Sequence, residues 1–277
     1  MIRKILSTPT GIFSSTVLVF AFSVAIFGQL IAPFGPNEID ISRMLQAPSA
    51  MNIFGTDELG RDVFSRTILS AQISMQVSAI SVSFALLFGA SAGLLAGYFG
   101  GWLDNVLMRV VDVLFAFPVL LLALAIVSIL GPGISTATFA ITVVYIPIFA
   151  RIARSSAISV VQEPYVKAAK SIGASPARTI LTHLLPNIAA PLIVQTSISL
   201  AFAILNEAAL SFLGLGAQPP TPTWGRMLFD AKGFLDQAWW MAVFPGLAVF
   251  LTVLAFNLLG DNLRDSLDVT TDRNEAK

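Results

Sequence analysis

Glu163 to Pro186 reads EPYVKAAKSIGASPARTILTHLLP and separates two long apolar blocks of the chain. Glu163 can cap a helix, and Pro164 then stands at the first helical position, where proline is favoured. Gly173 follows as a stop residue, because glycine readily adopts the left-handed conformation found just beyond a helix end. Pro176 can begin a second helix that ends at Pro186. The stretch therefore predicts two short helices that meet at a glycine corner.

The first of these helices is amphipathic. One face holds the residues at positions i, i+3, i+4 and i+7, which are Tyr165, Ala168, Ala169 and Ile172. The other face holds Lys167, Lys170 and Ser171. From the residues alone two interpretations stay open. The helices are either a connector that rests on lipid headgroups or a surface that a partner protein approaches closely.

The composition of the chain indicates a polytopic membrane protein. Of its 277 residues 56% are hydrophobic and only 12% are charged, whereas a soluble domain carries roughly 25% charged residues. The mean hydropathy is +0.81. A formal net charge of zero gives no indication of nucleic-acid binding. The absence of cysteine and the single histidine exclude thiolate chemistry and multi-histidine metal sites. No Walker A pattern occurs, so any ATP would be bound by another chain.

Six apolar segments are expected to cross the membrane, which gives an all-α fold. They are residues 12–32, the later part of 67–103, 113–131, 135–150, 188–205 with an extension towards 212, and 241–259. A cleaved signal peptide is the alternative for the first segment. The apolar core of this segment is, however, longer than the apolar core of a signal peptide. Gly89, Gly93 and Gly97 predict close helix packing in the second segment, and Gly131-Pro132-Gly133 predicts the turn between the third and fourth.

The distribution of positive charge predicts the orientation. Six crossings place both termini on one side of the membrane. If that side is the cytoplasm, eleven of the sixteen lysines and arginines lie inside, in agreement with the positive-inside rule. Residues 163–186 are then cytoplasmic as well. Arg151 and Arg154, just before them, are expected to anchor at the headgroups, with contact to a partner protein as the alternative.

The stretch from 163 to 186 resembles the EAA motif of bacterial ABC-importer permeases, which is EAA, three residues, Gly, nine residues and then I-x-L-P. Here the pattern is Lys167-Ala168-Ala169, Gly173 and His183-Leu184-Leu185-Pro186, with Lys in place of Glu and His in place of Ile. Four further stretches are similar to the dipeptide, oligopeptide and nickel branch, specifically its C-type permease: residues 54–62, 206–216, 222–225 and 256–265.

This resemblance implies a type I ABC-importer permease fold and a transport function without chemistry in this chain. It divides the chain into residues 1–70 (first transmembrane helix and periplasmic loop), 71–265 (a core with five transmembrane helices and the cytoplasmic coupling helices 163–186) and 266–277 (cytoplasmic tail). The implied location is the bacterial plasma (inner) membrane. The implied cargo is a di- or oligopeptide, with nickel or another small solute as the alternative.

The resemblance also implies the partners. They are a homologous second permease that forms a heterodimer with this chain, two ATPase subunits, and an extracytoplasmic solute-binding protein. ATP and Mg would be bound by the ATPases, and this chain would bind no cofactor and no catalytic metal. The residues expected to dock an ATPase are Tyr165, Lys167, Ala168, Ala169, Gly173, Ala174, Ser175, Leu185 and Pro186.

Asn206 and Glu207 are the candidate residues of the translocation path or gate. Glu207 is the only acidic residue well inside an apolar run, and an intramembrane carboxylate is a functional candidate by default. At ~1.5 Å per residue it lies about 30 Å beyond Asn187, near the outer surface. A structural or gating hydrogen bond and a contact with substrate both stay open.

Other functions find less support in the residues. Asp57, Glu58 and Asp62 alternate with arginines, which favours a structural ion-pair network over acid–base catalysis. A self-contained secondary transporter or channel usually shows internal repeats and ionisable residues in several membrane helices. An intramembrane enzyme would need paired carboxylates or a Ser/His pair, which the apolar segments do not contain.

Overall fold

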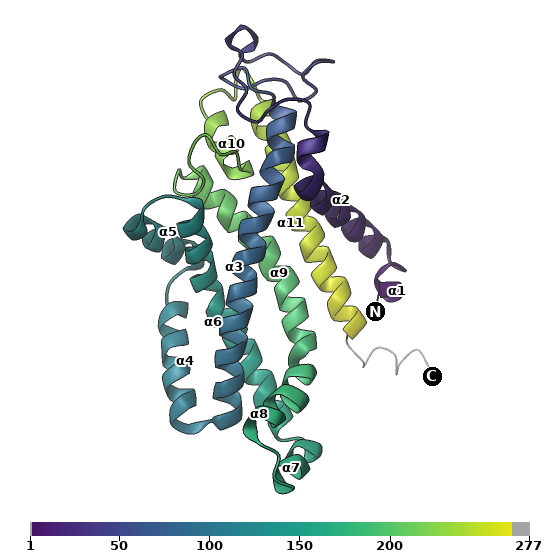
Figure 1. Cartoon of the computed structure of the whole chain (residues 1–277), viewed down its shortest axis with the longest axis vertical. Coiled ribbons are helices and arrows are strands. Elements are labelled where there is room, and N and C mark those ends of the chain that lie inside the picture. Colours follow the sequence, from purple (N-terminus) through teal and green to yellow (C-terminus); the bar gives the residue numbers. More distant parts are fainter. Residues whose placement is uncertain (1, 268–277) are drawn as a thin grey trace.

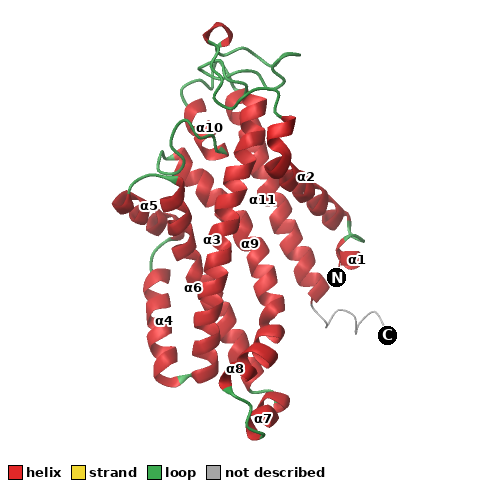
Figure 2. Ribbon diagram, in the orientation of Figure 1, coloured by secondary structure: helices red, strands yellow, loops and turns green. Residues whose placement is uncertain are grey.

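The computed structural model describes residues 2–267, so most of the predicted tail 266–277 lies outside the described residues. Over the described range the secondary structure is helical, apart from one isolated bridge between Thr56 and Asp62 (Figure 2). The helices are α1 (Ile2–Ile5), α2 (Pro9–Ile31), α3 (Val63–Phe99), α4 (Gly101–Phe115), α5 (Val119–Leu130), α6 (Ile134–Val161), α7 (Pro164–Ser171), α8 (Pro176–Thr179), α9 (Leu185–Phe212), α10 (Trp224–Ala231) and α11 (Trp240–Leu267). A 3-10 turn (Ile41–Arg43) and a π-helical turn (Ile180–Leu184) complete the set.

The long helices run roughly along the longest axis of the molecule, and loops gather at both ends (Figure 1). Residues 32–62 and α10 lie at one end, which we call the loop end. Residues 163–186 lie at the other, which we call the motif end. α1 and the last turns of α11 lie side by side, away from the loop end. There the Thr8 hydroxyl donates to Asn262 Oδ1 at 2.7 Å.

Within residues 2–267, five continuous helices are long and apolar enough to cross a membrane: α2, α3, α6, the continuous helix over 176–212, and α11. α4 and α5 together would make a sixth, but they are bent by 89°. The predicted continuous span 113–131 is therefore wrong. Helix α4 ends at Phe115 and α5 begins at Val119. Pro118 causes this break, because it lacks an N–H and disfavours helical geometry in the residue before it.

The prediction that Pro186 ends a second short helix is also wrong. From Pro176 the chain passes through the π-helical turn into α9, which continues to Phe212. The Leu185 N–H donates to the carbonyl of Ile180, five residues back. Pro186 then lies in the first turn of α9, where a missing N–H costs little. A local π turn thus accommodates the proline within a continuous helix.

Helices α3 and α6 pack with their backbones in close approach. A Cβ atom added at Gly93 would lie 2.2 Å from the Ala150 carbonyl oxygen, and one at Gly97 would lie 2.8 Å from Ala157 Cβ. The close packing predicted from the glycine spacing is thus confirmed. The motif end follows directly from α6, the second of these two helices.

Candidate functional site

Helix α7 and its glycine corner lie in the first half of the motif end. Pro164 occupies the first helical position. After the helix, the Gly173 N–H donates to Lys170 O and the Ala174 N–H donates to Ala169 O, both at 3.0 Å. With a Gly173 φ of +85° this is a Schellman ending. No atom lies within 4 Å of where a Gly173 Cβ would stand, so the backbone angle, and not space, requires glycine. The predicted corner is confirmed.

Few side chains attach α7 to the rest of the chain. Val166 is fully buried. The Lys170 ammonium lies 4.3 Å from the ring centroid of Tyr98, at the end of α3. The Tyr165 ring lies 6.1 Å from the His183 ring in an edge-on arrangement. Helix α7 is thus held by one buried aliphatic side chain and two ring contacts.

The residues predicted to dock an ATPase lie mostly on the surface. Tyr165, Lys167, Ala168, Gly173, Ser175, Leu185 and Pro186 are exposed, whereas Ala169 and Ala174 are half-buried. Ile172 beside the corner is 87% exposed, and Leu181 is 62% exposed. Apolar side chains left open next to lysines are typical of a surface that another protein covers.

Asn206 and Glu207 make separate contacts on α9. Glu207 is buried and accepts hydrogen bonds from the Ser74 hydroxyl at 3.0 Å and the Ser211 hydroxyl at 2.8 Å. Ser211 Oγ in turn accepts from the Ala217 N–H at 3.1 Å. The carboxylate therefore ties α9 to α3 and to the loop that follows α9. Asn206 Nδ2 donates to the Tyr145 hydroxyl on α6 at 2.9 Å.

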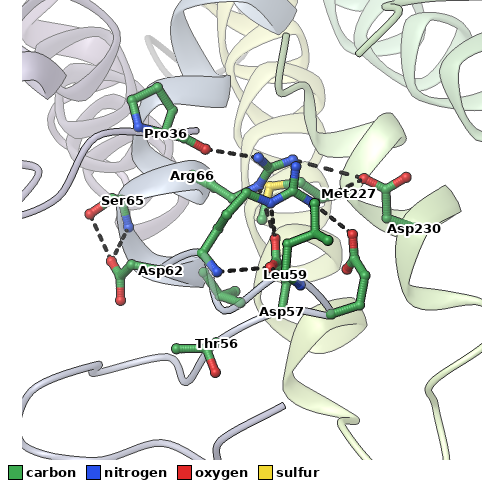
Figure 3. A network of polar contacts seen from close by, with 12 residues as sticks. Pro36, Thr56, Asp57, Leu59, Asp62, Ser65, Arg66, Met227 and Asp230 are labelled. Atoms are coloured by element: carbon green, nitrogen blue, oxygen red, sulfur yellow. Dashed lines mark hydrogen bonds and ion pairs between the residues drawn. The ribbon is translucent and has the colours of Figure 1, made fainter. Parts of the chain in front are cut away.

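The loop end contains a buried network of ion pairs. Arg61 Nε lies 2.6 Å from Asp57 Oδ2, and its NH2 lies 2.7 Å from Glu58 Oε1. Arg66 lies between Asp57 and Asp230, with N–O distances of 3.5 and 3.8 Å (Figure 3). The ion-pair network predicted from the alternating charges is confirmed for Asp57 and Glu58, whereas Asp62 forms none of the described ion pairs. Asp230 also belongs to this network, but it could not be predicted as a member because it comes from α10, far along the chain.

Further contacts fix this network on α3. Asp62 caps α3 by accepting from the Ser65 N–H at 2.7 Å, and its other oxygen accepts from Asn52 Nδ2 at 2.8 Å. Arg66 NH1 donates to the Pro36 carbonyl at 2.8 Å (Figure 3). Burial raises the pKa of the Glu58 carboxyl, and the neighbouring Asp57 carboxylate raises it further. The carboxylates thus serve to position the loop.

A cleft between α4 and α6 contains the two arginines expected at the headgroups. Arg154 binds Asp104 with two contacts, Nε–Oδ1 at 2.5 Å and NH2–Oδ2 at 2.6 Å. Arg151 NH2 lies 2.7 Å from Asp112 Oδ1. Both arginines therefore pair with carboxylates of α4, which are too distant in the sequence for this pairing to be predicted. The α4–α6 cleft has a volume of about 520 Å³ and is lined by Met108, Asp112, Arg151, Ile152, Arg154 and Ser155.

With this geometry described, comparison with known proteins identifies the family. Residues 85–271 match the model of the binding-protein-dependent transport system inner membrane component. The chain belongs to this family. Residues 1–48 match the N-terminal transmembrane domain of oligopeptide transport permease C. The resemblance to ABC-importer permeases is thereby confirmed, and so is the assignment as a multi-pass membrane protein.

Curated relatives cover nearly the whole chain. The dipeptide transport system permease protein DppC of Alkalihalophilus pseudofirmus is 48% identical over 245 residues, which are 88% of this chain and 81% of the relative. The glutathione transport system permease protein GsiD of Pectobacterium atrosepticum is 41% identical over 267 residues, 96% of this chain and 89% of the relative. Both relatives are transport subunits, in agreement with a transport role.

A solved structure supports the fold independently. The MetNI methionine ABC transporter in an inward-facing conformation matches 73% of this chain and 96% of its own, with a TM-score of 0.59 and 19% identity. At this identity the likeness shows the fold alone. Members of the family are the permease components of ABC importers, which work with ATPases and binding proteins.

Proposed function

We propose that this chain is a permease subunit of a bacterial ABC importer for di- or oligopeptides, located in the inner membrane. The observation that carries the proposal is the motif end: an EAA-type helix and glycine corner that are exposed at the tip of a family-typical helix bundle. Peptide cargo is supported by the names of the relatives, which transport a dipeptide or the tripeptide glutathione.

The remaining subunits follow from the same proposal. A homologous second permease completes the translocation path, and two ATPase subunits bind ATP and Mg and dock at residues 163–186. A solute-binding protein delivers cargo at the loop end. The charge bias supports a cytoplasmic motif end and cytoplasmic termini. This chain transmits force and catalyses no reaction.

Within the chain, Asn206 and Glu207 are proposed as gate residues. Glu207 holds the loop after α9 against α3 through Ser211 and Ser74. A movement of α9 driven from the motif end therefore acts on the loop end through this carboxylate. A direct contact with substrate is less well supported, because both carboxylate oxygens already accept hydrogen bonds.

The test is purification of the tagged chain followed by reconstitution. We expect two ATPase subunits and a second permease to co-purify. Proteoliposomes that contain this complex and its binding protein should take up radiolabelled dialanine when ATP is supplied to the ATPase side. A chain that purifies alone would contradict the docking assignment. A complex that takes up nickel and not dialanine would contradict the peptide assignment.

A further inference from the structure

Four charged side chains of α4 and α6 form ion pairs across the α4–α6 cleft. In the candidate spans of the described chain, Arg66 and Glu207 are buried, and the charges of α11 lie in its last two turns. The remaining charged side chains are Arg178 at the motif end and, on α4 and α6, Asp104, Arg109, Asp112, Arg151 and Arg154. Charged side chains within membrane segments generally face a water-filled cavity and mark the path of a substrate.

The two ion pairs in this cleft differ in kind. The Asp104–Arg154 pair has two short contacts, and the Asp104 side chain is only 16% exposed. The Asp112–Arg151 pair has one contact, and its side chains are 54% and 49% exposed. An exposed pair of this kind contributes only about 0–1 kcal/mol. The Asp104–Arg154 pair therefore holds α4 against α6. The side chains of the Asp112–Arg151 pair can separate and bind other charged groups with little loss of free energy.

The lining of the cleft suits a short peptide. A guanidinium such as that of Arg151 matches a carboxylate, and the Asp112 carboxylate matches an ammonium group. Met108 adds a thioether that adapts to varied side chains. The Arg151 guanidinium also lies 3.9 Å from the ring centroid of Phe115, which orients it. The volume of about 520 Å³ lies within the usual range for small-molecule sites, about 300–1,000 Å³.

Helix α4 is attached in a way that lets the cleft change width. Its only buried residue is Val111. At one end Gly100 and Gly101 have φ values of +63° and +59° with no neighbour within 4 Å of either Cβ position. At the other end the helix stops before Pro118. The two ends can therefore act as hinges while the Asp104–Arg154 pair retains α4.

We propose that the α4–α6 cleft is a transient binding site for zwitterionic peptides on the translocation path, with Arg151 binding the peptide carboxylate and Asp112 its ammonium group. This inference rests on the proposed peptide-import function. It assigns a ligand role to two side chains that a purely structural account treats as a surface ion pair.

The first test measures selectivity in the reconstituted importer, with dialanine and alanyl-alaninamide as substrates. Arg151→Gln should lower the initial uptake rate of dialanine about tenfold, as expected for the loss of one charge-assisted hydrogen bond, and should affect the amide much less. Arg151→Lys should restore part of the rate. Arg264→Gln, at an exposed arginine near the end of α11, is the matched control and should leave both rates unchanged. An equal loss for both substrates, or no loss, would overturn the inference.

The second test locates the peptide directly and does not depend on amide transport. A photoreactive amino acid at Met108 should become labelled by radioactive dialanine during ATP-driven uptake, and Arg151→Gln should abolish this labelling. The same amino acid at Phe250, a position 58% exposed on α11, is the control and should stay unlabelled. Equal labelling at the two positions, or cross-linking of position 108 to the partner permease alone, would overturn the inference. A wild-type complex that takes up no dialanine would instead contradict the proposed function.

Discussion

The two ends of this molecule use charged residues in opposite ways. At the loop end Asp57, Arg61 and Arg66 are buried and neutralise one another within the chain. At the motif end Lys167 and Lys170 are exposed, and Lys170 contacts only a tyrosine ring among the described contacts. Helix α3 joins the two ends, from its cap at Asp62 to Tyr98, over about 55 Å at ~1.5 Å per residue.

This difference separates scaffold from contact surface. A charge network that is satisfied internally fixes the shape of its loop, and removing one member leaves other buried charges unpaired. Exposed lysines beside exposed apolar side chains destabilise the isolated chain little. They contribute contacts when a partner protein covers them. Substitutions at the loop end should therefore change stability, whereas substitutions at the motif end should change transport.

The largest effect is expected for Arg66→Met. The Arg66 side chain is 3% exposed and lies between Asp57 and Asp230. Its removal leaves these carboxylates less well neutralised and should cost about 3–5 kcal/mol, seen as a lower Tm of the detergent-solubilised chain. Arg43→Met is the control, because the Arg43–Asp40 pair is more exposed and water screens its attraction, so its loss should lower Tm much less. Equal Tm values for both variants would contradict a scaffold role for the loop end.

The next effect concerns Gly173→Ala at the motif end. Alanine at a φ of +85° costs about 1–2 kcal/mol locally, so the corner should change shape while the helix bundle stays folded. We expect a several-fold drop in ATP-driven uptake with the Tm unchanged. Gly233→Ala, also in open space but without a positive φ, should leave uptake unchanged. A fall in Tm without a fall in uptake would reverse the comparison between the two ends.

A smaller effect is expected for Lys170→Met. The variant removes the cation–π contact with Tyr98, worth about 0.5–1 kcal/mol at an exposed site. Because this contact orients α7 on α3, ATP hydrolysis should continue while the amount of peptide imported per ATP falls. Lys170→Arg should restore the ratio. A parallel loss of hydrolysis and uptake would show that the contact serves assembly and not orientation.

The smallest effect is a pH dependence at the loop end. The pKa of Glu58 is raised by burial and by Asp57, so the folded state favours the protonated carboxyl. The stability that this proton contributes is present below the unfolded pKa and is lost as pH rises through the raised folded pKa. Between about pH 4 and pH 7, wild-type Tm should fall relative to Glu58→Gln, which does not ionise. A constant Tm difference would contradict this burial effect.

Local features were predictable from the sequence, because they depend on residues close together in the chain. Gly173 predicts the corner after α7, since few other residues tolerate a positive φ. The ion pairs of Asp57 and Glu58 with Arg61 follow from a spacing of three or four residues. The contacts of Arg66 with Asp230 and of Arg154 with Asp104 were not predictable, because they depend on how distant helices pack.

The two errors in helix boundaries both concern proline. Pro118 lies in a long apolar run, and hydropathy gives the length of such a run but not the direction of its helices. The 89° bend between α4 and α5 therefore cannot be predicted from hydropathy. Pro186 predicts the end of a helix, but the π turn before it allows the helix to continue. A proline thus predicts a local constraint, and the surrounding hydrogen bonds decide whether the helix breaks.

The most direct test of the central claim, that the motif end docks the ATPase, uses the absence of cysteine from this chain. A single cysteine is introduced at exposed Ala168 on α7 or, as the control, at exposed Leu59 in the loop end. A short bifunctional thiol cross-linker is then applied to the assembled importer. We predict a cross-link from position 168 to an ATPase subunit and none from position 59. No ATPase cross-link from position 168, together with one from position 59, would contradict the account.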